Sequence, residues 1–126
     1  MCSQDDETVD HVFFQYNYAN RVWSWLCSWS GMMAAVPTDF ASFIACANAL
    51  KPDGKRFKLI LSLGYLVLWL IWRERNERIF GKMIQNPMQL ADDIQLLSFS
   101  WIKNRGNLKS LCWADWSLSP QSVCNL

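Results

Sequence analysis

The side chains most able to do chemistry in this chain are one histidine, His11, and five cysteines. A thiol beside an imidazole is the nucleophile and base of many hydrolases. His11 could in principle pair with Cys2 or Cys27, but no orienting third group and no oxyanion-hole motif accompanies either pair. We therefore expect no catalytic nucleophile. The five cysteines lie at Cys2, Cys27, Cys46, Cys112 and Cys124.

The adjacent carboxylates Asp92 and Asp93 follow Ala91, as in the A-D-D tract of polymerase active sites, where paired acids hold two Mg²⁺ ions. Here they lie near the start of a helical pattern, where acidic residues simply suit the positive end of the helix dipole. The chain also contains no phosphate-binding glycine-rich loop. We expect no enzyme activity, no cofactor and no small-molecule substrate.

A cluster of charges, RERNER, occupies positions 73–78. One interpretation is a solvated helix end, with Glu74 and Arg78 in the favourable i, i+4 order. The other is a contact to nucleic-acid phosphates, because Arg and Lys supply most of such affinity. With a net charge of +1, nucleic-acid binding would be weak and indifferent to sequence. Its candidate contacts are Arg73, Arg75, Arg78, Lys103, Arg105 and Lys109.

The elements that must position these side chains are helices, because apolar residues recur at spacings of three and four. We expect helices over about 8–15, 19–29, 39–50, 55–80 and 87–103. Thr38 or Asp39 should be the N-cap of the third, and Asn86–Pro87 should start the last. Gly31 and Gly81 should end two of them. Residues 107–126 show no clear period and carry Trp113 and Trp116. We expect an irregular, tryptophan-rich tail that packs its indoles on the helices.

The composition indicates one compact domain of 126 residues, with 52% apolar residues, 18% charged residues and eight tryptophans. Such a composition excludes a disordered segment and an acidic tail. Residues 3–10, SQDDETVD, are the opposite of a basic targeting leader, and the cysteine spacings fit no disulfide scaffold. We therefore expect reduced thiols and a location in the cytoplasm or nucleus.

The most apolar stretch runs over residues 59–72, LILSLGYLVLWLIW, fourteen residues without a charge. A bilayer needs roughly 20 apolar residues, so we interpret the stretch as the buried centre of a helical domain. The alternative is membrane association through residues 59–72, with an endomembrane location, because the chain is aromatic and poor in charge.

Three stretches resemble a known family. ETVDHVFF at 7–14 followed by RVW at 21–23, and WLIWRERNERIF at 69–80, resemble motifs of the zinc-binding C-terminal domain in plant LINE-type retrotransposon reverse transcriptases. WSLSP at 116–120 is similar to the ending of those polyproteins. The three stretches lie in the family's order and span almost the whole chain.

The resemblance implies a zinc site that has decayed. Cys2 matches the second cysteine ligand and His11 the histidine, whereas the first cysteine falls before Met1 and the last falls on Tyr16, which cannot replace a thiolate. Two ligands of four cannot hold structural zinc tightly, so we expect no bound metal. On its own, His11 reads as a polar residue on the surface of a short helix.

Together these observations predict an all-α fold: about five helices around the long apolar helix, a domain over 1–106 whose residues 1–30 resemble the zinc-binding segment, and the tail over 107–126. The expected function is that of a non-enzymatic remnant or co-opted fragment of a retrotransposon polyprotein, acting through contacts with a protein partner. A small membrane-associated effector and a weak nucleic-acid-binding module are the alternatives.

Overall fold

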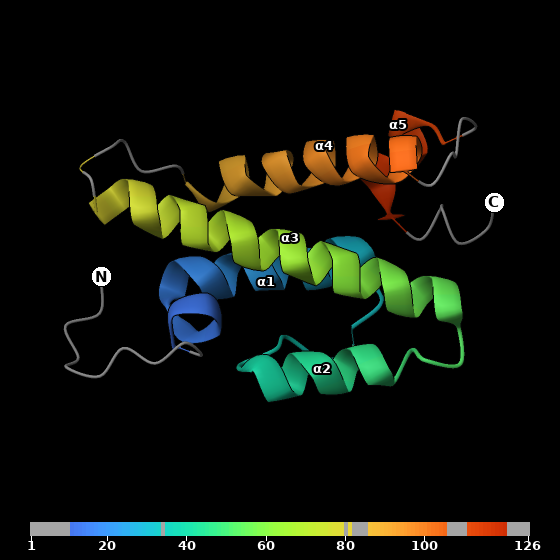
Figure 1. Ribbon diagram of the computed structural model, residues 1–126, viewed down its shortest axis with the longest axis horizontal. Coiled ribbons are helices and arrows are strands. Elements are labelled where there is room, and N and C mark those ends of the chain that lie inside the picture. The colour runs from blue at the N-terminus through green and yellow to red at the C-terminus, as the bar shows by residue number, and fades with distance from the viewer. Residues whose placement is uncertain (1–10, 34, 80, 82–85, 106–110, 121–126) are drawn as a thin grey trace.

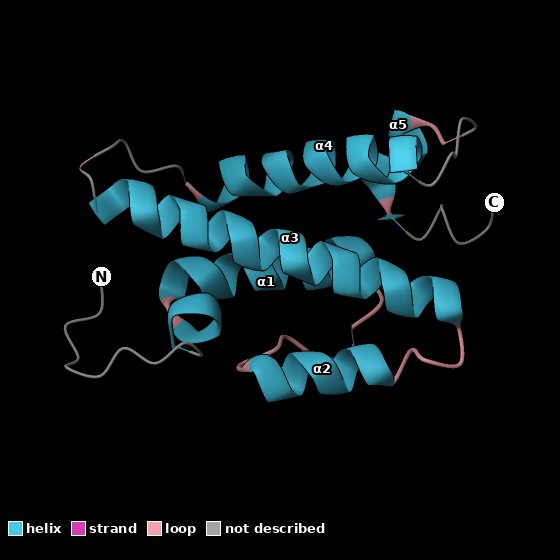
Figure 2. Ribbon diagram, in the orientation of Figure 1, coloured by secondary structure: helices cyan, strands magenta, loops and turns pink. Residues whose placement is uncertain are grey.

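The computed structural model describes residues 11–33, 35–79, 81, 86–105 and 111–120, and this part of the chain is all-α, as expected (Figure 2). A π-helical turn, η1, comes first and five α-helices follow within the described ranges. Their bounds are His11–Gln15 for η1, Asn17–Ser30 for α1, Phe40–Asn48 for α2, Gly54–Ile79 for α3, Pro87–Arg105 for α4 and Trp113–Leu118 for α5.

Helix α1 begins at Asn17, two residues earlier than the sequence pattern indicated. Tyr18 is buried in line with Val22 at a helical spacing of four, which draws the start of the helix back to Asn17. The helix ends as predicted at Gly31. Its backbone is left-handed with φ 65°, and its amide donates to the Cys27 carbonyl.

The predicted start signals of α2 and α4 are both confirmed. Asp39 accepts a hydrogen bond of 2.7 Å from the Ser42 amide, and the Ser42 hydroxyl accepts one from the Asp39 amide, which completes a capping box. Asn86 caps α4 in the same reciprocal way, with Gln89 as its partner. Because these hydrogen bonds join residues only three positions apart, the starts of both helices could be predicted from the sequence.

Helix α3 crosses the centre of the molecule, with α4 along one side, α2 along the other and α1 behind it (Figure 1). Its inner face is apolar and buried over residues Leu59, Ile60, Leu63, Gly64, Val67, Leu70 and Ile71. Gly64 lies directly against the ring of Phe43 in α2, where a Cβ would overlap the ring. None of the helices within the described residues is long and apolar enough to cross a bilayer.

The C-terminal region packs its indoles on the helices, as predicted, and contains the short helix α5 that the sequence did not indicate. Trp116 is fully buried and its ring nitrogen donates to the Gln95 carbonyl at 3.1 Å. Trp29 in α1 donates in turn to the Ser117 carbonyl at 3.0 Å. A helix of six residues is too short to show a period, so only its tertiary contacts reveal it.

Candidate functional site

The residues of the expected decayed zinc site are only partly described. Cys2 lies outside the described residues, and His11 begins η1 while its side chain lies outside them. Tyr16, at the position of the last cysteine ligand, precedes α1 and is half-buried. Within the described ranges, no three His, Cys, Asp or Glu side chains come together in a way that could hold a metal ion.

Two of the cysteines in the described part of the chain, Cys27 and Cys46, both approach the Ala35 carbonyl, at 3.7 and 3.8 Å. Burial, followed by the neighbouring Cys46, raises the pKa of the Cys27 thiol to about 11. A thiol with so high a pKa is protonated at neutral pH, and only the thiolate is a strong nucleophile. This environment favours a structural role for Cys27.

The adjacent acids Asp92 and Asp93 diverge on the surface of α4. Asp92 is exposed, whereas Asp93 forms an ion pair with Arg73 of α3 at 3.6 Å. Neighbouring residues on a helix do not face one another. The geometry therefore offers no paired-carboxylate site of the kind that binds two metal ions.

The candidate nucleic-acid contacts do not form one strip. Arg73 lies over the Trp69 ring at 5.1 Å beside α4, Arg78 reaches the start of α1, and Lys103 lies over the Phe99 ring at 5.3 Å. Arg75 lines the same cavity as Arg78. Lys109 and the side chain of Arg105 lie outside the described residues. The described cations thus point toward three different neighbours.

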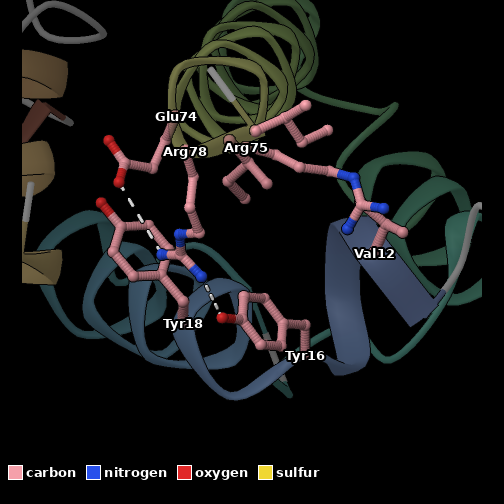
Figure 3. A pocket seen from close by; sticks show the side chains of 8 residues that line it. Val12, Tyr16, Tyr18, Glu74, Arg75 and Arg78 are labelled. Carbon is pink, nitrogen blue, oxygen red and sulfur yellow. Dashed lines mark hydrogen bonds and ion pairs between the residues drawn. The ribbon is translucent and has the colours of Figure 1, made fainter. Parts of the chain in front are cut away.

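Arg78 is the centre of a polar cluster that ties the end of α3 to the start of α1 (Figure 3). Its guanidinium donates a hydrogen bond to the Tyr16 hydroxyl and lies 3.7 Å from a carboxylate oxygen of Glu74. The same cation lies 5.5 Å from the ring centres of Tyr16 and Tyr18, within the range of cation–π attraction. Glu74 is only 3% exposed, so the cluster sets a positive charge beside a buried negative one.

A cavity of about 90 Å³ lies beside this cluster and is walled by Val12, Ile71 and Ile79. Burial, and secondarily the Glu74 carboxylate, raises the pKa of Tyr18 above its ordinary value. Its phenol therefore stays neutral at physiological pH. Since Arg78 is already engaged by Tyr16 and Glu74, we assign the cluster a structural role in holding η1 and α1 against α3.

The other candidate site is an uncovered face of α3. Tyr65 is 69% exposed and Trp69 and Trp72 are each 51% exposed, although all three belong to the apolar stretch expected to be buried. Their spacing of four and three places them on one side of the helix. Leu97 and Trp101 of α4, 41% and 42% exposed, flank them. These five residues are called the aromatic surface below.

The aromatic surface is hollowed where α3 and α4 meet. A groove of about 380 Å³ is lined by Ser62, Tyr65, Leu66, Trp69, Leu97 and Trp101. Large exposed apolar patches on soluble proteins mark sites of interaction, and Trp and Tyr dominate binding energy at protein interfaces. The groove therefore has the shape and chemistry to accept an apolar side chain of a partner.

This surface could not be predicted from the apolar pattern alone, because a run of apolar residues does not show which of its faces a neighbour covers. The signal that could have found it is the side-chain type. Tyr and Trp, each with a polar atom that tolerates water, occupy the outer positions of the run, while Leu, Ile and Val occupy the inner ones. The expected buried centre is thus confirmed for the inner face of the helix only.

Comparison with known proteins returned no match to this chain, whether among family models, curated proteins or solved structures.

Proposed function

We propose that this chain is a non-enzymatic helical protein that binds a protein partner through the aromatic surface. The observation that carries the proposal is the exposure of Tyr65, Trp69 and Trp72 beside a groove. Leaving such rings in water forgoes roughly 25 cal/mol for each Å² of apolar surface that a partner would cover. On the described face of α3, a partner would therefore gain the most binding free energy by covering this surface.

We further propose that the chain derives from the zinc-binding domain of a plant LINE-type polyprotein, with its metal site lost. What supports this origin is the mutual packing of the two stretches that carry the resemblance. Val12 of the first stretch and Ile71 of the second line the same cavity. Tyr16, at the lost ligand position, accepts a hydrogen bond from Arg78 of the second stretch. The polar cluster now joins segments that a metal site would otherwise help to organise.

A protein partner fits the surface better than a nucleic acid does. Phosphate binding requires several cations along one track. Beside the aromatic surface Arg73 is paired with Asp93, and Arg78 and Lys103 are directed elsewhere. Weak nucleic-acid binding, in the cytoplasm or the nucleus, remains the lesser candidate.

A membrane surface is the second candidate, because the same three rings protrude from the apolar stretch. Tyr and Trp favour the headgroup region of bilayers, and Lys58, directly before the stretch, is exposed. A hollow between two helices suits a protruding side chain rather than a flat bilayer, so we rank the protein partner first.

The proposal predicts site-selective photo-crosslinking. Benzoylphenylalanine placed at Tyr65, in the aromatic surface, should yield discrete crosslinked polypeptides when the tagged chain is irradiated in cells. The same probe at Leu118, which is 80% exposed on α5, is the control and should yield none. Denaturing gels and mass spectrometry of the purified tagged chain provide the measurement.

Three outcomes separate the candidates. Discrete protein bands from the Tyr65 probe alone support the proposal. Equal labelling from both positions, or none from either, contradicts it. Adducts to lipid from the Tyr65 probe, together with sedimentation of the wild-type chain on vesicles of phosphatidylcholine and phosphatidylserine, would favour the membrane-associated candidate instead.

A further inference from the structure

The aromatic surface is as large as the apolar part of a stable dimer interface. An aromatic side chain offers roughly 150–250 Å², so the exposed parts of Tyr65, Trp69, Trp72 and Trp101 amount to about 300–500 Å². A standard interface buries about 800 Å² on each partner, a little over half of it apolar. The exposed rings therefore match the apolar core of one such interface.

The groove of one copy of the chain and the Trp72 ring of a second copy can be brought together by pairing two α3 helices. Trp72 is half-exposed but does not line the groove, whereas four other residues of α3 form one wall of it: Ser62, Tyr65, Leu66 and Trp69. If two copies of α3 lie antiparallel and are centred between Val67 and Leu68, Trp72 of one copy comes opposite position 63 of the other. Leu63 is itself buried, but it lies between the wall residues Ser62 and Tyr65, so Trp72 comes level with the N-terminal end of the groove. By two-fold symmetry the exchange occurs twice, which makes the surface self-complementary.

The same register brings opposite charges together. It sets Lys58 of one copy opposite Glu77 of the other, again twice. Lys58 is exposed and Glu77 is half-buried, so both can approach a second chain. The two positions are nineteen residues apart on α3, about 28 Å along the helix, so they lie at the two ends of the aromatic surface.

We propose that the aromatic surface binds a second copy of this chain, through antiparallel pairing of α3 in which Trp72 of each copy enters the groove of the other. The inference rests on the proposed function, since it names the partner of the same surface. A parallel pairing would set Lys58 against Lys58 and leave Trp72 facing Trp72 rather than the groove. The register therefore specifies orientation as well as partner.

Sedimentation equilibrium of the purified full chain between about 1 and 100 μM tests the pairing, because small interfaces with good anchors reach micromolar affinity or better. The wild-type chain should dimerise in this range. Trp72→Ala should weaken the dimer about 30-fold, as expected for a central aromatic anchor. Trp113→Ala is the matched control, since Trp113 is 42% exposed on α5 and should leave the dimer unchanged. Circular dichroism checks that each variant remains helical.

A charge exchange tests the register independently of any tryptophan. Lys58→Glu and Glu77→Lys should each weaken the dimer about tenfold, counting two pairs per dimer, and the double variant should recover most of the affinity. Failure of the double variant to recover overturns the register, and equal affinities of Trp72→Ala and Trp113→Ala overturn the docking of Trp72. A chain that stays monomeric at 100 μM overturns the second copy as partner. In that case the proposed function is still supported if the Tyr65 probe crosslinks polypeptides that differ in mass from this chain. It is contradicted if the probe crosslinks none.

Discussion

Leu70→Asp should unfold the chain, whereas Trp69→Asp at the neighbouring position should leave it folded. Leu70 is fully buried on the inner face of α3, and Trp69 is 51% exposed on the outer face. Removing a buried leucine costs about 2–5 kcal/mol, and a buried unpaired carboxylate adds several more. That total matches or exceeds the whole stability of most small domains, about 5–15 kcal/mol.

The expected result for Trp69→Asp is a loss of at most about 1 kcal/mol, mainly from its contact with Arg73. Far-UV circular dichroism with urea titration measures both variants. Trp69→Asp should keep the helical signal and a cooperative transition, and Leu70→Asp should have neither. A similar response of the two variants would show that the faces of α3 are not divided as described.

Arg78→Met should destabilise the chain by about 3 kcal/mol, the scale on which removing one partner of a buried ion pair acts. The substitution keeps much of the side-chain volume but takes the cation away from the Glu74 carboxylate and the Tyr16 hydroxyl. It also removes the cation from the rings of Tyr16 and Tyr18. The start of α1 should then separate from α3 more readily.

The urea midpoints of three variants, compared with that of the wild type, measure this effect and identify its cause. Tyr16→Phe, which removes one neutral acceptor, should cost about 1 kcal/mol. Glu74→Gln in the Arg78→Met background should regain most of the loss, because a neutral amide is less costly to bury than a carboxylate. If Arg78→Met were as stable as the wild type, or if Glu74→Gln regained nothing, the ion pair would not be what holds these segments together.

The features that the sequence predicted well are those decided by neighbouring residues. Asp39 and Asn86 cap their helices through bonds to residues three positions later, and Gly31 ends α1 through its own backbone conformation. Such interactions involve only a few consecutive residues, so the pattern of helices could be predicted without a structure.

The features that the sequence did not predict depend on distant residues. Arg78 and Tyr16 are separated by 62 positions, and Trp116 is buried by partners in α1 and α4. Which face of α3 stays uncovered depends on where α1, α2 and α4 pack around it. Residues 73–78 were expected to be a solvated helix end, with a phosphate contact as the alternative. The fold instead buries Glu74 beside Arg78 and pairs Arg73 with Asp93 of α4.

The central claim, that α3 has one buried face and one uncovered aromatic face, is tested most directly by hydroxyl-radical footprinting with mass spectrometry. The intact chain should be labelled at low concentration, where copies do not pair. Trp69 and Trp72 should be oxidised rapidly, while Trp23 and Trp116, both fully buried, should be protected until the chain is unfolded in urea. Protection of Trp69 and Trp72 equal to that of Trp23 in the dilute chain would contradict the claim.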